Sequence, residues 1–116
     1  MNRRSTLLTL AFAIASATFA TAGTVEAGQV KGSNVKMVLY GQGSAASGAF
    51  VQTGNGTWIE HNQDGRFDFR EEGRDEWSVY LIKVGRQAGQ RVQLDLHRKT
   101  VSSGNYVFYS ILRSFE

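Results

Sequence analysis

The amino-acid sequence of 116 residues contains no cysteine, no proline and only two histidines. Without cysteine the chain cannot form a disulfide framework, a zinc–thiolate site or a thiol nucleophile. It also lacks a strong charge of one sign. Arg3 and Arg4 lie in the leader described next, and removing them from the thirteen basic residues leaves eleven, against ten acidic residues. A nearly neutral domain has no cationic field for binding nucleic acid, so we expect no nucleic-acid partner.

The first 22 residues have the three parts of a secretory signal peptide. Arg3 and Arg4 give a positive start, an uncharged apolar stretch covers residues 7–20, and residues 20–22 offer a small–x–small cleavage site. The apolar stretch at residues 7–20 is shorter than the roughly 20 apolar residues that a membrane-spanning helix needs. We therefore predict that the signal is cleaved and that the mature protein does not insert into a membrane. A second cleavage site lies at residues 25–27, and the two arginines leave Sec and twin-arginine export open. The protein is therefore expected to be secreted or periplasmic.

The mature chain has the pattern of a small all-β protein. Residues 23–34 are mostly small and polar, which predicts a flexible lead-in, and residues 35–116 are long enough for a single domain with its own core. Short runs of Val, Phe, Tyr, Trp and Leu alternate there with clusters of Gly, Asn, Asp and Ser. The pattern predicts an antiparallel sandwich or barrel of about seven strands. The expected strands are 35–40, 49–52, 57–61, 66–71, 76–84, 91–98 and 106–112.

Alternation along these strands separates core positions from surface positions. One shared core is predicted to contain Phe67, Phe69, Trp77, Val79, Leu81, Val92, Leu94 and Leu96. The strand at 76–84 is apolar on its other side as well, where Tyr80 and Ile82 lie. Either a second layer, for example residues 35–40, covers these two side chains, or they form an apolar island on the surface.

Two segments resemble those of a known group of proteins. Residues 74–81 read R-D-E-W-S-V-Y-L, and residues 94–101 read L-D-L-H-R-K-T-V. The pair resembles an uncharacterised family of small secreted bacterial β-domains, over residues 50–101. That family has no known activity, so the resemblance implies a recurring β-module and no catalytic residue. Residues 83–90 depart from the family's spacer, which is shorter and richer in Asp, Ser and Arg.

The residues that could hold a metal are too few and too scattered. Asp95 and His97 lie two positions apart on one expected strand and share a face, but a metal needs three or four converging ligands. A solvated strand face explains the same pair. Glu60, His61, Asp64 and Asp68 cluster around the sequence Asp64-Gly65, where a tight hairpin is favoured over a calcium loop. We therefore expect no metal and no cofactor.

Catalytic patterns are also missing. The sequence contains no Gly-x-Ser-x-Gly elbow, and the glycine-rich residues 41–48 lack the Lys-Ser/Thr of a phosphate loop, so we expect a flexible connector there. Acidic residues at 71, 72, 75 and 76 interleave with arginines at 66, 70 and 74, which predicts cross-strand pairs on a sheet surface. No catalytic residue is assigned.

These observations favour a non-enzymatic exported binding module whose partner is a protein or a carbohydrate. Aromatic and apolar side chains on the surface of a small β-domain stack on sugars or anchor a protein. Trp58, Tyr80 and Ile82 are the candidate binding residues. Two alternatives stay open: a small secreted hydrolase that uses carboxylates, and a structural module that associates with itself as a homodimer.

Overall fold

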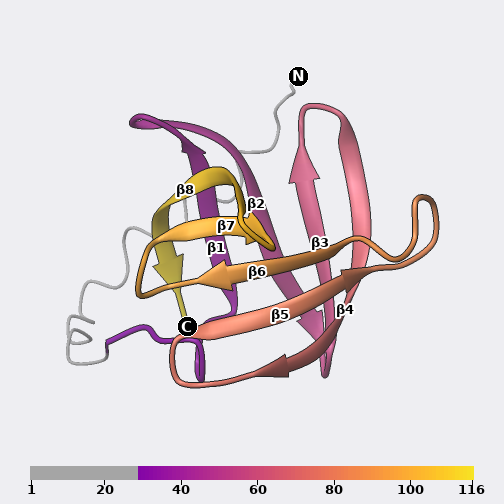
Figure 1. Cartoon of the computed structure of the whole chain (residues 1–116), viewed down its shortest axis with the longest axis horizontal. Helices are drawn as coiled ribbons and strands as arrows, with labels where there is room; N and C mark the ends of the chain where they lie inside the picture. The colour runs from indigo at the N-terminus through magenta and orange to yellow at the C-terminus, as the bar shows by residue number, and fades with distance from the viewer. Residues whose placement is uncertain (1–28) are drawn as a thin grey trace.

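A computed structural model describes residues 29–116, so the expected signal peptide at 1–22 and the first half of the lead-in lie outside the described residues. The described chain forms one closed barrel of antiparallel strands in chain order, in which β8 returns to pair with β1 (Figure 1). The prediction of an all-β antiparallel fold is confirmed, and a barrel rather than a sandwich is formed. The strands are β1 (Met37–Gln42), β2 (Ala45–Gly54), β3 (Thr57–Asn62), β4 (Gly65–Arg74), β5 (Ser78–Lys83), β6 (Arg91–Asp95), β7 (Thr100–Ser103) and β8 (Tyr106–Phe115).

The tight hairpin predicted at Asp64-Gly65 joins β3 to β4. Asn62 pairs with Gly65 across a two-residue loop. The Asn62 side-chain oxygen accepts a hydrogen bond from the Asp64 backbone N–H at 2.8 Å. Gly65 has a φ of 125°, which a residue with a side chain rarely adopts. The local chemistry of these residues therefore sets the register of the hairpin.

The strands differ from the predicted ranges most clearly in three places. Residues 41–48 were expected to be a flexible connector, but they form the β1–β2 hairpin, with Gly43 at a φ of 65° in its turn. β7 was not expected at all. β6 ends at Asp95 rather than continuing to residue 98, because the Asp95 carboxylate accepts the backbone N–H groups of His97 and Arg98 and turns the chain.

Inward-facing side chains fill the barrel. Tyr40, Phe50, Trp58 and Phe69 supply the large rings from β1–β4, and the later strands add mostly aliphatic side chains. Six of the eight predicted core residues are buried, and Phe67 and Trp77 are half-buried and packed against them. The common core of the three strands is therefore confirmed.

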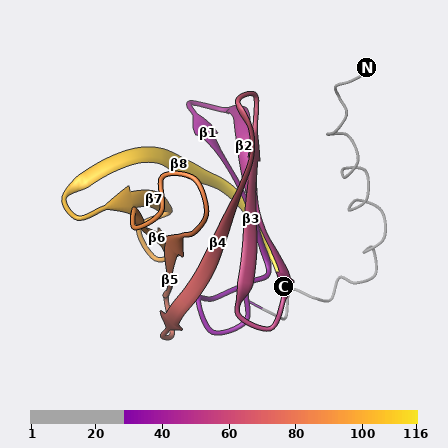
Figure 2. The same ribbon diagram turned by 90° about the vertical axis from the view of Figure 1, so that its right-hand side faces the viewer.

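The barrel is strongly coiled. In Figure 1, β1–β3 run upright, β4 bends at its lower end to run along β5, and β5–β7 cross the upright strands. Figure 2 shows the β7–β8 hairpin curving away from the β1–β2–β3 side. Register shifts occur at Tyr40/Gly41, Glu71/Gly73 and Val101/Ser102, where extra residues bend the strands. We call the end with the turns after β1, β3, β5 and β7 the hairpin end, and the opposite end the clamp end.

The second half of the lead-in, residues 29–34, is attached to the clamp end. The Gly32 N–H donates to the Glu76 carbonyl at 2.8 Å, Val35 is fully buried, and Val30 packs against the core. The Asn34 side-chain oxygen accepts the Lys31 N–H at 2.7 Å and shapes the turn between them. The described residues 29–34 therefore contact the barrel, within the stretch 23–34 where the sequence predicts a flexible lead-in.

Candidate functional site

One side of the barrel carries apolar residues on its outer surface. Across β8, β1, β2 and β3, a row of outward side chains runs in register from Phe115 to Met37, Val51 and Ile59. Leu39 and Ala49 form a second, paired row beside it. All six side chains are half-buried, although the barrel interior is already filled from the other face of the same strands. We call these six residues the apolar face.

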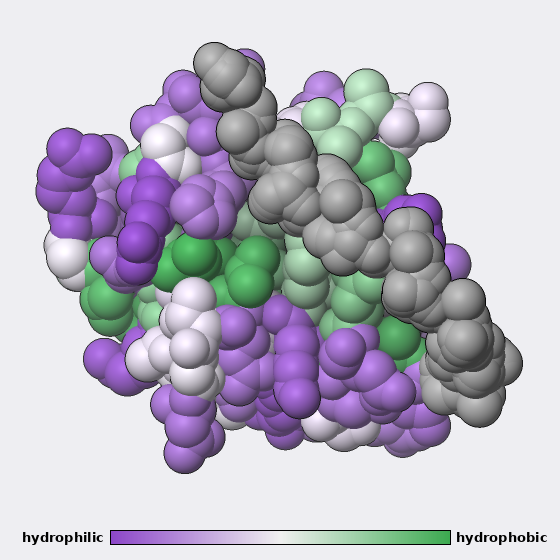
Figure 3. Space-filling model, turned by 180° about the vertical axis from the view of Figure 1, so that it is seen from behind, coloured by the Kyte–Doolittle hydropathy of each residue, from purple (hydrophilic) through white to green (hydrophobic). Residues whose placement is uncertain are grey.

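The neighbouring strand β4, which pairs with β3, has a different outer surface. The outward positions of β4 are Arg66, Asp68, Arg70 and Glu72, and all four are exposed. Figure 3, which views the molecule from behind, shows hydrophobic residues gathered in a band over the β1–β2–β3 side, with hydrophilic residues above and below. Scattered apolar side chains are normal on a protein surface, but a contiguous group on four adjacent strands is typical of an interaction site.

Tyr80 and Ile82 lie on the outer side of β5, facing away from the core. No second layer from residues 35–40 covers them, because β1 lies between β2 and β8. Tyr80 is 37% exposed, and its hydroxyl donates to Asp75 Oδ2 at 2.9 Å. Three donors, the backbone N–H groups of Ser78 and Trp77 and the Tyr80 hydroxyl, lower the pKa of the Asp75 carboxyl.

An ion pair divides the surface around Ile82. Ile82 is flanked in register by Arg70 on β4 and by Arg91 on β6. Arg91 Nε donates to Glu72 Oε1 at 2.9 Å. Since β5 lies between β4 and β6, this pair reaches across the outer side of β5. The apolar surface at Tyr80 and Ile82 is therefore smaller than the apolar face.

The remaining predicted site residues are not together. Trp58 lies inside the barrel and is 1% exposed, which corrects its expected place on the surface. Asp95 and His97 do not share a strand, since β6 ends at Asp95 and the His97 ring lies 5.3 Å from the Trp77 ring. Among residues 29–116, no group of three or more histidine or acidic side chains is placed to hold a metal ion.

The residues around the β3–β4 turn point to different sides. Glu60 faces the interior, where its carboxylate accepts the Tyr40 hydroxyl and, at 3.2 Å, the Asn62 amide, whereas His61 and Asp68 are exposed outside. Burial and the carboxylate raise the pKa of Tyr40 well above its usual range. The Tyr40 ring stacks on Tyr109 with centroids 4.3 Å apart. This polar cluster closes the hairpin end of the core.

Gly48 gives the Tyr40 ring its space. An added Cβ at Gly48 would press against the Tyr40 hydroxyl and approach the His61 carbonyl oxygen to 2.6 Å. The absence of a side chain at this position of β2 is therefore required by the polar cluster at the hairpin end.

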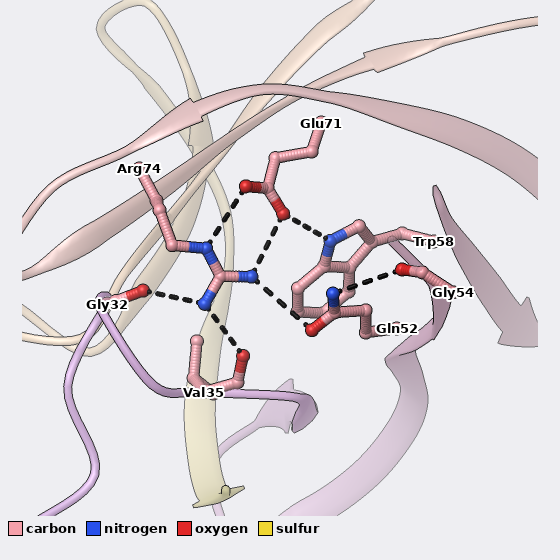
Figure 4. Close-up of polar contacts among 7 residues, drawn as sticks. All are labelled: Gly32, Val35, Gln52, Gly54, Trp58, Glu71 and Arg74. Atoms are coloured by element: carbon pink, nitrogen blue, oxygen red, sulfur yellow. Dashed lines mark hydrogen bonds and ion pairs between the residues drawn. The ribbon is translucent and has the colours of Figure 1, made fainter. Parts of the chain in front are cut away.

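The clamp end is held by Arg74, as Figure 4 shows. Its guanidinium donates to both Glu71 carboxylate oxygens, at 3.1 and 2.9 Å. It also reaches the carbonyl oxygens of Gly32 and Val35, at 3.1 and 3.2 Å, and the Gln52 amide oxygen at 3.4 Å. The Trp58 indole N–H donates to Glu71 at 3.0 Å. The Arg74 hydrogen bonds lower the pKa of the Glu71 carboxyl.

The polar groups of this end are hydrogen-bonded to one another. A hollow of about 490 Å³ lies beside the network, and Lys36, Gln52, Glu71, Arg74 and Glu116 are among its lining residues. Arg74 is already saturated with acceptors. Glu60 and Glu71, the two inward-facing carboxylates in the described part of the chain, lie at opposite ends of the barrel and are each held by donors. They do not form the facing pair that glycoside hydrolysis requires.

No helix in residues 29–116 is long and apolar enough to cross a membrane. A comparison with known proteins found no matching family model, no similar curated protein and no similar solved structure.

Sequence reasoning overlooked the apolar face, although a signal for it is present. Residues 37–40 read M-V-L-Y and are apolar at consecutive positions, as residues 79–82 are. The register adds what the sequence does not contain: it brings Met37 beside Val51 and Phe115, and Val51 beside Ile59.

Proposed function

We propose that this protein is an exported, non-enzymatic binding module that recognises a protein partner through its apolar face. The observation that carries the proposal is the in-register row Phe115–Met37–Val51–Ile59, with Leu39 and Ala49 beside it. These side chains are not needed to fill the barrel, whose core is complete on the inner side of the same strands.

The edges of the apolar face support the comparison with a protein interface. Leu39 is paired with Arg113 on β8, and Ile59 is paired with Asp68 on β4. His61 lies beside Ala49 and is exposed. An apolar centre with a charged rim is the usual anatomy of a protein–protein contact.

A protein partner is favoured over a carbohydrate by the kind of side chains present. Sugars stack on exposed aromatic rings, and the apolar face contains a single ring, Phe115, which is half-buried. The most exposed ring in the described chain, Tyr106, is 66% exposed and lies in the β7–β8 hairpin, outside the apolar face. Five aliphatic or thioether side chains on adjacent strands fit a flat protein surface better.

The experiment compares two matched substitutions on outward, half-buried positions. Val51→Asp places a charge in the middle of the apolar face, and Ile82→Asp places the same charge on the outer side of β5. Tagged wild-type protein and both variants are incubated with the exported protein fraction of the source cells, and captured proteins are compared by mass spectrometry. Sedimentation velocity of each purified protein reports self-association.

The proposal predicts a captured protein that Val51→Asp loses and Ile82→Asp retains, while both variants keep the wild-type circular dichroism. Concentration-dependent dimers of the wild type that Val51→Asp abolishes would mean that the partner is a second copy. Retention of all captured proteins by Val51→Asp, or their loss from Ile82→Asp alone, would contradict the proposal. The second result would favour the β5 surface.

A further inference from the structure

A groove of about 320 Å³ lies beside the C-terminal half of β8. β7 is short and pairs only with residues 106–110 of β8, so the following residues of β8 pair with β1 alone. Residues 29–30, the turn after β6 and the free half of β8 enclose the space. The groove is thus a consequence of the unequal lengths of two neighbouring strands, and it adjoins the apolar face at Arg113.

The inner lining of the groove is apolar. Leu96 and Ile111 reach it from the core, and Val30 and Leu112 flank them. The half-buried Trp77 ring completes the wall, and its orientation is fixed by its surroundings. Lys31 Nζ lies 5.5 Å from the centroid of the Trp77 ring. The centroid of the His97 ring lies 5.3 Å from the same point. A ligand would therefore meet the Trp77 ring and the small exposed parts of Leu96 and Ile111, bordered by polar side chains of the lining.

The charge of the groove is of one sign. Lys99 and Arg113 line it and are exposed, and none of the described lining residues carries a carboxylate. Within residues 29–116, neither cation forms an ion pair within 4.0 Å, and the Arg113 guanidinium lies 5.5 Å from the centroid of the Phe115 ring. The nearby acidic residues are engaged elsewhere: Glu76 pairs with Lys31, and Asp95 accepts backbone N–H groups.

The backbone at Lys99 is held in an uncommon conformation. Its φ is 61°, in the left-handed region that residues with a side chain rarely adopt. The Lys99 carbonyl accepts the Ile111 N–H at 2.8 Å, which ties this residue to the start of the free half of β8. The conformation therefore fixes the lysine at the edge of the groove.

We propose that this groove binds a small amphipathic acid, a medium-length apolar chain that ends in a carboxylate. The chain would lie on Leu96, Ile111 and Trp77, and the carboxylate would meet Lys99 and Arg113. At about 30 Å³ for each water molecule, the space equals roughly eleven waters. A chain of eight to ten carbon atoms suits that volume.

The test uses decanoate as the probe, below its micellar concentration, on the full exported chain. The indole N–H signals of Trp58 and Trp77 are followed by NMR, since Trp77 lines the groove while Trp58 lies in the core. The matched ligand is decanol, which has the same chain without the charge. The matched protein is the double variant Lys99→Asn and Arg113→Gln, because asparagine tolerates a positive φ.

The proposal predicts a saturable shift of the Trp77 signal, with little change at Trp58. Decanol and the double variant should each weaken the affinity by about tenfold, as expected for losing two charge-assisted contacts. Equal affinity for decanol, an unchanged affinity in the double variant, or no shift at Trp77 would each overturn the assignment. Tighter binding of a peptide ending in leucine would also overturn it, in favour of a peptide site.

Discussion

Arg74 offers a sharp test of how the clamp end of the barrel is held. Its side chain joins the β4 carboxylate of Glu71, the β2 amide of Gln52 and two carbonyl groups of the lead-in. The substitution Arg74→Met keeps much of the apolar stem and removes all of these hydrogen bonds. It also leaves Glu71 with the Trp58 indole as its remaining donor in the network.

The expected loss of stability follows from the burial of the pair. The Arg74 and Glu71 side chains are only 21% and 16% exposed. Removing one partner of a buried ion pair leaves an uncompensated charge and costs about 3–5 kcal/mol, and we expect the lower end because the site is partly solvated. With a slope near 1 kcal/mol per molar urea, the unfolding midpoint should fall by about 3 M.

The assay is urea unfolding followed by tryptophan fluorescence, with Arg91→Met as the control. Arg91 forms an equivalent ion pair with Glu72, but its side chain is 69% exposed, so its loss should barely move the midpoint. Equal midpoints for the two variants would refute the reasoning that burial makes the Arg74 network important.

The pH dependence of stability is a second test of the contact between Arg74 and Glu71. Because Arg74 lowers the pKa of Glu71 in the folded state, the stabilisation is present above the ordinary carboxyl pKa and is lost as the pH falls through the lowered value. The wild type should therefore lose more stability than Arg74→Met between pH 6 and the acid range. Parallel stability curves for the two proteins would contradict the assignment.

Three further predictions concern the core, a glycine and the leader. Leu94→Ala should lower the free energy of unfolding by about 2–5 kcal/mol in a denaturant melt, because Leu94 is fully buried. Gln93→Ala should lower it by about 1 kcal/mol, because the Gln93 amide donates to Ser78. The reverse order would mean that the β6 register is wrong. Gly48→Ala should lower the free energy of unfolding by about 1–3 kcal/mol, because the added Cβ would press on Tyr40. The control Gly73→Ala has open space around the added Cβ and should change it by less than about 0.5 kcal/mol. Intact-mass measurement of the exported protein should show a first residue between Gly23 and Gly28, and retention of Met1 would exclude the cleaved signal.

Much of the fold could be predicted because local patterns and global packing agree. Alternation in residues 91–96 places Val92, Leu94 and Leu96 on one side, and all three are buried. The Asp64-Gly65 turn forms where the residues favour positive φ. These features depend on neighbours in sequence, so a single chain reveals them.

The features that the sequence did not predict correctly depend on contacts between residues far apart in the sequence. Trp58 resembles any aromatic residue on a short strand, and only closure of the barrel shows that its indole reaches Glu71 inside. β7 is four residues long and contains two serines, so its strand character comes from pairing with β6 and β8. Residues 29–34 have little apolar surface, and they are held by Arg74, which hydrogen-bonds the Gly32 carbonyl from 42 positions away in the sequence.

The apolar face could be predicted from the sequence only in part. Each of its residues is visible as an apolar position in the sequence, but their grouping requires the β8–β1 closure that pairs Met37 with Phe115. The order of the strands in space, rather than the composition of any one of them, creates this surface.

Site-specific photocrosslinking tests the central claim most directly. A benzophenone amino acid replaces Val51 in the apolar face, and in a control protein it replaces Ile82 on the outer side of β5; each protein is irradiated in cells that export it. Because the apolar face is proposed as the contact surface, position 51 should give one defined adduct, either with another protein or with a second copy, and position 82 should not. Adducts from position 82 alone, or none from position 51 while the protein is folded and exported, would contradict the account.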